Sequence, residues 1–169
     1  MQIQSGLYKG RRVKTVKNAP YRPTTSLVRK SLFDILGTLQ GKHVLDLFAG
    51  SGIVGFEAAS RGASSITFVE SSMRVNYLLK INGSLFKQTD FKYIKQDAIK
   101  FIADCDQYDI IFADPPYDYD SNEKFITDAI NHLNQDGILI LESSIKDYSI
   151  SPYRIKEYGD TQLTFWRNE

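Results

Sequence analysis

The 169-residue chain has little of the chemistry that builds covalent frameworks or metal clusters. Cys105 is its only cysteine, so no disulfide or cysteine-ligated cluster can form within the chain. Two histidines, His43 and His132, disfavour a histidine-rich metal site, and we expect no metal. Eleven glycines and five prolines are too few for a collagen-like or low-complexity chain.

Long apolar runs are also missing. No run approaches the roughly 20 residues that span a bilayer, and the first residues lack the apolar core of a signal peptide. We therefore expect a cytoplasmic protein without a membrane partner. With 42% hydrophobic residues, the chain is long enough for one soluble domain with a sizeable core, and we expect a monomer.

The first thirty positions contain no acidic residue, so positive charge is concentrated in this segment. The segment has a net charge of +8, whereas the whole chain has +1. A basic arm on an acidic body favours a polyanionic partner such as nucleic acid. The alternative is a solvated basic face without a partner. The basic residues are Lys9, Arg11, Arg12, Lys14, Lys17, Arg22, Arg29 and Lys30.

From residue 43 onward, short apolar runs alternate with amphipathic stretches. Such alternation predicts an α/β fold: a doubly wound, mostly parallel sheet with helices on both faces. Gly159 and Asp160 between two further runs predict a C-terminal antiparallel hairpin. The strands are expected at 43–48, 65–69, 91–95, 108–113, 137–142, 153–158 and 162–167, and the helices at 52–61, 72–87, 97–103 and 122–134.

The first 37 residues are expected to form a small basic extension followed by a helix. The helix begins after Thr24 or Thr25 and ends at Gly37. Its expected apolar face leaves Arg29 and Lys30 on the opposite side; that face consists of Leu27, Val28, Leu32, Ile35 and Leu36. We expect one domain over 1–169, with residues 38–169 as its catalytic core.

A glycine-rich turn follows the first strand of that core. Gly50, Gly52 and Gly55 satisfy G-x-G-x-x-G where a strand leads into a helix, and Glu70 ends the next strand. Glycines there let the backbone approach a ligand, and a carboxylate at that strand end can accept hydrogen bonds from both ribose hydroxyls. The pattern fits both NAD and S-adenosylmethionine.

Asp46 favours the second of these cofactors. Its carboxylate precedes Gly50 by four residues and would repel a pyrophosphate, but it would attract the ammonium and sulfonium groups of S-adenosylmethionine. Asp46 could equally organise the turn by hydrogen bonding. Asp97, which follows the third strand, could accept from an adenine amine or cap the next helix.

The segment Asp114-Pro115-Pro116-Tyr117 closes the fourth strand, where open α/β sheets place ligands. Two prolines fix the backbone and leave carbonyl groups beside the Asp114 carboxylate. These acceptors would hold an exocyclic amine with its lone pair toward an electrophile, and Tyr117 would stack on a planar base. The segment therefore predicts transfer of a methyl group to a nucleobase amine.

These motifs resemble those of the bacterial 16S ribosomal RNA guanine-N2 methyltransferases, over nearly the whole chain. The resemblance rests on Asp46–Gly52, Glu57–Ala63, Val69-Glu70, Asp114–Tyr117, Arg22–Thr24 and Arg29–Phe33. It departs at Lys30, where the family pattern has Glu. The resemblance implies a class I (Rossmann-like) methyltransferase fold, S-adenosylmethionine as cofactor, and a guanine of 16S rRNA in the small ribosomal subunit, or its assembly intermediate, as acceptor.

The resemblance also implies roles for individual residues. Glu70 would bind the ribose, Asp97 and Ala98 the adenine, and Gly50 and Gly52 the methionine end of the cofactor. The expected cofactor site is Asp46, Phe48, Gly50, Gly52, Glu70, Asp97 and Ala98; the catalytic group is Asp114, Pro115 and Tyr117; and the RNA-binding residues are Lys9, Arg11, Arg12, Arg22 and Arg29.

Two alternatives share part of this pattern. An NAD-dependent oxidoreductase would use the glycine turn and Glu70, but it gives no role to Asp114–Tyr117. A DNA adenine or cytosine amino-methyltransferase would use the same chemistry, but it usually needs a recognition domain, for which this chain has little room beyond the basic arm.

Overall fold

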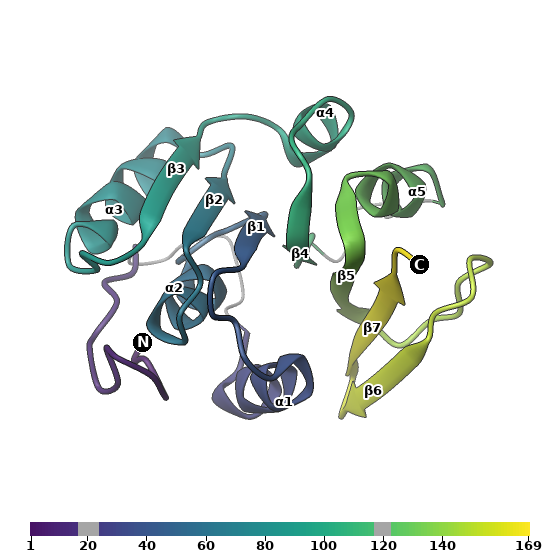
Figure 1. Ribbon diagram of the computed structural model, residues 1–169, viewed down its shortest axis with the longest axis horizontal. Helices are drawn as coiled ribbons and strands as arrows, with labels where there is room; N and C mark the ends of the chain where they lie inside the picture. Colours follow the sequence, from purple (N-terminus) through teal and green to yellow (C-terminus); the bar gives the residue numbers. More distant parts are fainter. Residues whose placement is uncertain (17–23, 117–122) are drawn as a thin grey trace.

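A seven-stranded sheet forms the centre of the protein in the computed structural model, which describes residues 1–16, 24–116 and 123–169. The strand order is β3-β2-β1-β4-β5-β7-β6 (Figure 1). β1 to β5 are parallel, and β7 is antiparallel to both of its neighbours. This confirms the predicted mostly parallel sheet with a C-terminal hairpin. The strands are β1 (His43–Leu47), β2 (Ser65–Val69), β3 (Asp90–Ile94), β4 (Tyr108–Ala113), β5 (Leu133–Ser144), β6 (Arg154–Tyr158) and β7 (Thr161–Arg167).

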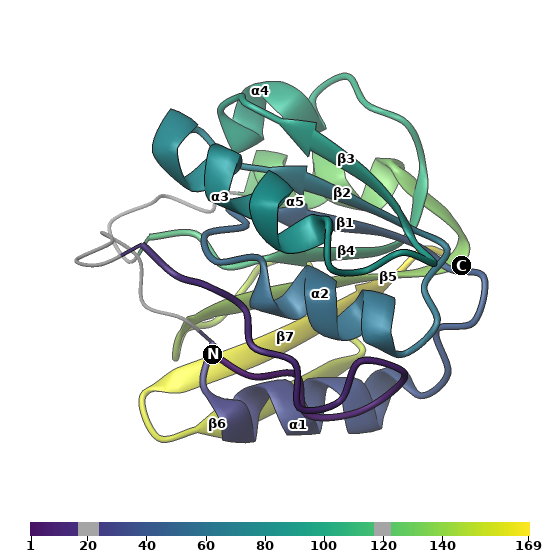
Figure 2. The same ribbon diagram turned by 90° about the vertical axis from the view of Figure 1, so that its left-hand side faces the viewer.

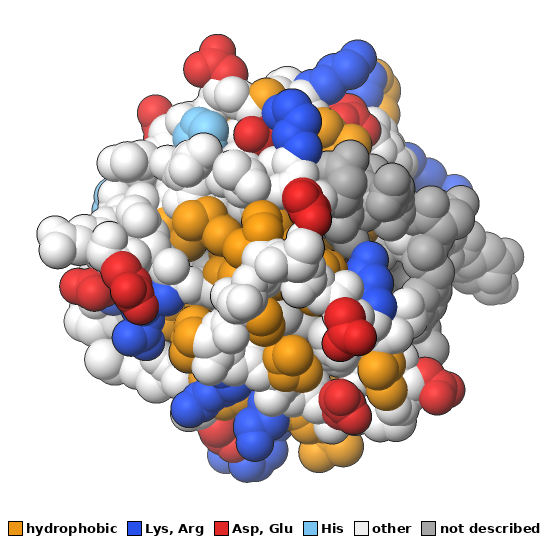
Figure 3. Space-filling view, turned by 90° about the vertical axis from the view of Figure 1, so that its right-hand side faces the viewer, with side chains coloured by type: hydrophobic (Ala, Val, Ile, Leu, Met, Phe, Trp, Pro, Cys, Tyr) orange, Lys and Arg blue, Asp and Glu red, His pale blue; other side chains and the backbone are white. Residues whose placement is uncertain are grey.

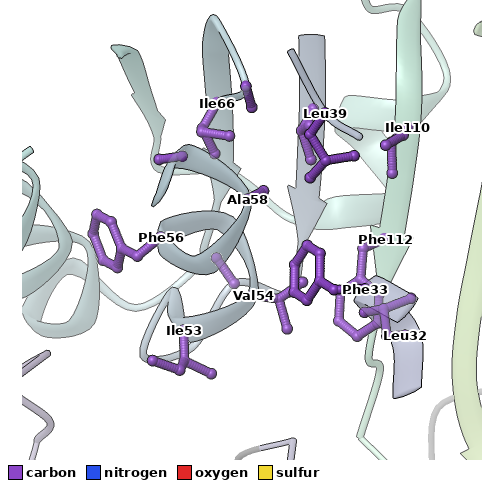
Figure 4. Close-up of a cluster of buried hydrophobic side chains, with 14 of the residues drawn as sticks. Leu32, Phe33, Leu39, Ile53, Val54, Phe56, Ala58, Ile66, Ile110 and Phe112 are labelled. Carbon is purple, nitrogen blue, oxygen red and sulfur yellow. The ribbon is translucent and has the colours of Figure 1, made fainter. Parts of the chain in front are cut away.

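Helices cover both faces of the sheet, because successive strand residues point to opposite sides. Val44 belongs to a core under α1 (Ser26–Leu36), α2 (Ile53–Ser60) and α3 (Met73–Gly83). Its neighbour Leu45 belongs to a second core under α4 (Ala98–Ile102) and α5 (Glu123–Asn131). Figure 4 shows the first core, where Leu32 and Phe33 of α1 lie beside Phe112 of β4, with Val54 of α2 next to them.

The order of the strands creates one crevice. From β1 the chain proceeds to β2 and β3 on one side, whereas β4 and β5 lie on the other side of β1. The connections that leave the carboxyl ends of β1 and β4 therefore run in opposite directions. In open α/β sheets, ligands bind at such a switch point.

Most element boundaries differ from the sequence-based expectation by one to four residues, with α3 ending at Gly83 and not at 87, and two of the differences have a clear structural cause. β1 ends at Leu47 because Phe48 has a positive φ of 58°, which ends the extended backbone. β5 begins at Leu133, inside the predicted helix, because this fully buried residue pairs with Tyr108. The register then shifts before Ile110, and Asp136 has a φ of 60°. No residue pattern in the sequence indicated that irregularity.

The first sixteen residues pack against the body of the protein. Gln2 and Arg12 form an antiparallel bridge, and Ile3 and Val13 are both 2% exposed in the same core as α1 and α2. The Leu7 amide donates to the carbonyl oxygen of Ser60 at the end of α2 (2.7 Å). Figure 2 shows this dark purple segment lying across α1 and α2. Residues 1–16 of the arm therefore form a docked loop that contributes to the core.

The helix α1 is rotated relative to the predicted stripe. Leu27, expected in the core, is 65% exposed, whereas Arg29 and Phe33 are buried together with Val28 and Leu32. The core-facing positions thus run 28, 29, 32 and 33. The sequence pattern put Arg29 on the wrong side because an arginine among apolar residues is normally solvated.

The edge of the sheet at β6 presents a mixed surface. Hydrophobic side chains gather in the middle of this face, with acidic and basic ones around them (Figure 3). Ile145, Tyr153 and Ile155 are the large hydrophobic residues exposed in this part of the chain. Among the described residues, no helix is long and apolar enough to cross a membrane.

Candidate active site

The turn between β1 and α2 has the geometry that its glycines predict. Gly50 and Gly52 have φ values of 51° and 73°, in the region that favours glycine. A Cβ atom on Gly52 would lie 2.5 Å from Leu79 Cδ2, and one on Gly55 would lie 2.4 Å from Phe68 Cε1. The first glycines therefore shape the turn, and Gly55 lets α2 approach β2.

Asp46 is buried beneath this turn. It is 2% exposed, and its Oδ2 accepts a hydrogen bond from the Gly55 amide at 3.0 Å. Burial raises the pKa of Asp46 to about 8, against the hydrogen bond from Gly55, which lowers it; the nearby charge of Glu70 raises it further. Asp46 thus organises the turn, and it also lines the cavity above it.

Glu70 connects the turns that follow β1 and β2. Its Oε2 accepts from the Gly50 amide (3.0 Å) and its Oε1 from the Ser72 amide (2.8 Å). A carboxylate has about four acceptor positions, so hydroxyl donors can be added to these two bonds. The half-buried Glu70 also lines the cavity.

The third strand contributes the next group. Asp97 caps α4, with its Oδ1 accepting from the amides of Ile99 (3.0 Å) and Lys100 (3.1 Å). Asp97, Gln96 and the buried Ala98 line the cavity. The capping interpretation of Asp97 is therefore confirmed, and its contact with adenine stays a prediction.

The fourth strand ends in the proline turn. Ala113, the last residue of β4, pairs with Leu47, the last residue of β1. The Asp114-Pro115-Pro116 turn therefore starts beside the glycine turn that follows β1. All three line the same cavity as Asp46, Phe48, Gly50 and Glu70. Tyr117 lies outside the described residues, so its predicted stacking role stays a prediction.

The resulting cavity has a volume of about 600 Å³ and lies at the carboxyl ends of β1 to β5. Its described lining holds five carboxylate residues and no Lys or Arg; the carboxylates are those of Asp46, Glu70, Asp97, Asp114 and Glu142. Such a lining favours a cationic ligand and disfavours a pyrophosphate. The residues present therefore fit S-adenosylmethionine better than NAD.

Sequence reasoning missed the cavity residues contributed by the last part of the sheet and by the start of α1. Glu142 ends the buried part of β5, and Thr24 precedes α1. The Thr24 hydroxyl, in a residue that is 5% exposed, donates to Glu142 Oε2 at 2.9 Å. The signals in the sequence were the position of Glu142 at the end of an expected strand and the place of Thr24 in the Arg22–Thr24 motif.

The basic residues of the arm differ in exposure. Lys9 and Arg12 are exposed, and Arg11 is partly covered because its guanidinium lies over the Tyr8 ring, 4.7 Å from the centroid. Arg22 lies outside the described residues. These residues remain predicted RNA contacts.

Arg29 requires a correction. It is 4% exposed, its Nε lies 3.6 Å from Glu57 Oε2, and its Nη2 donates to the carbonyl oxygen of Gln2 (2.8 Å). Burial lowers the pKa of Arg29, whereas the charge of Glu57 raises it. The prediction that Arg29 contacts RNA is wrong for this conformation, because the side chain ties the arm to α2. Lys30 instead pairs with Asp34 at the surface.

Comparison with known proteins agrees with this geometry. The family model described as Conserved hypothetical protein 95 matches residues 1–167. The Ribosomal RNA small subunit methyltransferase D of Escherichia coli K12 is 32% identical over 86% of this chain and 72% of that protein. The protein of the same name from Buchnera aphidicola of Baizongia pistaciae is 36% identical over 69% of this chain, but the match spans only 61% of that relative.

Solved structures agree on the fold. The structure of yhhF from Escherichia coli matches 100% of this chain and 98% of its own, with a TM-score of 0.88 and 29% identity. More distant methyltransferases, at 17% and 14% identity, share the fold alone and contain S-adenosylhomocysteine, the product that S-adenosylmethionine leaves after methyl transfer. S-adenosylmethionine is the cofactor that the acidic lining of the cavity fits. The chain belongs to the Conserved hypothetical protein 95 family, the family of methyltransferases that its motifs resemble.

Proposed function

We propose that this protein transfers a methyl group from S-adenosylmethionine to the exocyclic N2 amine of a guanine in 16S rRNA of the small ribosomal subunit. The observation that carries the proposal is that the Asp114-Pro115-Pro116 turn and the glycine turn open into one cavity. A donor site and an amine-binding site are thereby adjacent. Ribosomal RNA is the acceptor named for the relatives, the Ribosomal RNA small subunit methyltransferases D.

Each part of the cavity has a task in this reaction. When bound, S-adenosylmethionine supplies an electrophilic methyl group on a cationic sulfur. Glu70 would accept from the ribose hydroxyls, Asp97 and Ala98 would hold the adenine, and Gly50 and Phe48 would form the wall at the methionine end. Gly52 shapes the turn from below and does not line the cavity. Asp46 lies below the glycine turn with a pKa raised to about 8 by burial, and a cation bound beside it would favour its charged form.

Asp114 and the carbonyl groups of the proline turn hold the acceptor amine. A nucleobase amine is a poor nucleophile because its lone pair is delocalised into the ring. Hydrogen bonds to both N–H groups direct that lone pair toward the methyl carbon, so positioning supplies most of the acceleration. During methyl transfer, with S-adenosylhomocysteine as the leaving group, Asp114 would stabilise the positive charge on the amine nitrogen, and the proton would then leave to water.

The test is methyl transfer from labelled S-adenosylmethionine to three acceptors: small ribosomal subunits, naked 16S RNA and naked duplex DNA. The ribosomal acceptors come from cells that lack this protein, and nuclease digestion with mass spectrometry identifies the product. We expect N2-methylguanosine at one position of the 16S RNA. Methyladenine or methylcytosine in the DNA would support a DNA amino-methyltransferase instead.

Asp114→Ala is the matching variant. It should reduce turnover by about 10²–10³-fold, by analogy with the removal of one positioned hydrogen-bonding group, and leave donor affinity nearly unchanged. Normal turnover of Asp114→Ala would contradict the amine-holding role.

A further inference from the structure

The cavity extends beyond the parts assigned to the methyl donor. Its donor end is built from the turns after β1, β2 and β3, and Asp114 ends β4. Past Asp114 the lining continues with Glu142 and Ser143 of β5, Thr161 of β7, and Thr24. This part has no task in holding the donor, and it lies on the acceptor side of the proline turn.

Glu142 lies next to Asp114 because of the register of the sheet. Ala113 and Leu141 are partners across β4 and β5, and Asp114 and Glu142 are the residues that follow them. Backbones of neighbouring strands are about 4.8 Å apart. Asp114 and Glu142 thus follow paired residues of neighbouring strands and line the same cavity, where their carboxylates can accept hydrogen bonds from adjacent donors on one ligand.

Thr24 fixes the direction of one of these carboxylates. Its hydroxyl donates to Glu142 Oε2 at 2.9 Å, and the buried Thr24 immediately precedes Thr25, whose side chain accepts from the Val28 amide at the start of α1. The Glu142 side chain is therefore held by a residue that the helix anchors. A preoriented acceptor discriminates between ligands better than a mobile one does.

Guanine and adenine differ at the atom beside the amine. In guanine the N2 amine neighbours N1–H, which is a hydrogen-bond donor. In adenine the N6 amine neighbours an N1 that carries a lone pair, and cytosine presents an N3 lone pair in the same place. A carboxylate accepts from N1–H and repels a lone pair.

Resting on the proposed function, we infer that Glu142 determines base specificity: it accepts from guanine N1–H while Asp114 holds the N2 amine, and Thr24 is its positioning residue. An exposed base that is read on its Watson–Crick edge would meet both carboxylates at once. Adenine and cytosine are rejected because they bring a lone pair to Glu142.

The test uses small subunits reconstituted with RNA that carries either guanine or 2-aminopurine at the mapped target position. 2-Aminopurine keeps the N2 amine but has a lone pair at N1. For the wild type we expect the ratio of kcat/KM, guanine over 2-aminopurine, to be about ten to a hundred. Glu142→Gln should lower this ratio at least tenfold, because an amide can donate to N1 as well as accept from N1–H.

Thr24→Val should lower the ratio in the same direction, and Thr24→Ser, which keeps the hydroxyl, should restore it. Glu157→Gln, an exposed change on β6, is the control for loss of one negative charge and should leave the ratio at the wild-type value. Donor affinity, measured by calorimetry on every variant, shows that each one has folded.

The outcomes separate the two proposals. If the wild type forms no N2-methylguanosine, the proposed function fails, and this inference fails with it. If the wild type forms it and Glu142→Gln binds donor but keeps the wild-type ratio, the proposed function stands and the role of Glu142 is refuted. A ratio that falls in Glu142→Gln and not in Glu157→Gln supports the inference.

Discussion

In the N-terminal arm, the residues that pack into the core are different from the residues that are positively charged. The charge can therefore be removed without disturbing the packing. Ile3 and Val13 are buried in the core, so deleting the arm would unfold part of the protein as well as remove charge. Replacing Lys9, Arg12 and Lys14 by Gln avoids this, because all three side chains are exposed. The triple variant should therefore fold and bind S-adenosylmethionine like the wild type.

Its affinity for RNA should fall and depend less on salt. Each phosphate contact with single-stranded RNA contributes about −0.7 to the slope of log K against log salt concentration, so losing three should flatten the slope by about 2. At about 0.15 M salt this corresponds to roughly a ten- to a hundredfold loss of affinity. Arg11 is kept, because its guanidinium packs over the Tyr8 and Phe86 rings.

The assay is filter binding or fluorescence anisotropy with 16S RNA fragments from 50 to 300 mM salt, together with calorimetry for donor affinity. A triple variant with the wild-type salt slope would refute the assignment of the arm as the RNA-binding element. A variant that loses donor affinity as well would show that the arm acts through the fold.

Three further predictions concern buried or bridging carboxylates. Glu70→Ala should weaken S-adenosylmethionine binding at least tenfold in calorimetry, because each lost charge-assisted hydrogen bond contributes about 1.5–3 kcal/mol; unchanged affinity would remove Glu70 from the site. Asp46 keeps its proton up to about pH 8 in the folded state, against an ordinary pKa of 3.8, so the folded state binds more protons than the unfolded one in that interval. Stability should therefore decline as pH rises from 3.8 through 8, and Asp46→Asn should flatten the decline in urea titrations; parallel profiles would argue against the raised pKa. Glu57→Gln should lower the free energy of unfolding by about 3–5 kcal/mol, since it leaves the Arg29 guanidinium buried without its counter-charge; a loss no larger than that of the surface change Glu157→Gln would contradict this.

Local motifs carried most of what the sequence could predict. Each motif consists of a few consecutive residues: the glycine turn, Glu70 at a strand end, and the proline turn. The alternation of strands and helices indicates that all three lie at the same end of the sheet. The structure places Gly50, Glu70 and the Asp114-Pro115-Pro116 turn around one cavity, whereas Gly52 and Gly55 pack against the core beneath it. Their grouping was predictable because parallel strands put all their carboxyl ends at one edge.

Contacts between distant segments were not predictable in the same way. Glu57 lies in α2 and is fully buried, yet it accepts from the Gln4 and Ser5 amides (2.8 and 3.0 Å) and faces the guanidinium groups of Arg29 and Arg61. Nothing in the sequence around Arg29 indicates this partner, which is 28 positions away. A charge pattern shows the sign of a segment, but whether an arginine faces solvent or a buried carboxylate depends on tertiary packing.

The arm is basic and the cavity is acidic, and this difference decides which part of an RNA can enter the cavity in the proposed reaction. Carboxylates at the cavity wall attract a sulfonium cation, but they repel the phosphate groups of an RNA chain within a Debye length of roughly 8–10 Å. The backbone of the acceptor is therefore excluded from the site, and only an uncharged base can enter it. Exposed cations such as Lys9 and Arg12 lie in the docked arm and not in the cavity lining. Holding the backbone on this outer surface while a single base enters the acidic cavity requires the base to leave its stack, so an unpaired or loosely paired guanine is the acceptor that this charge distribution favours.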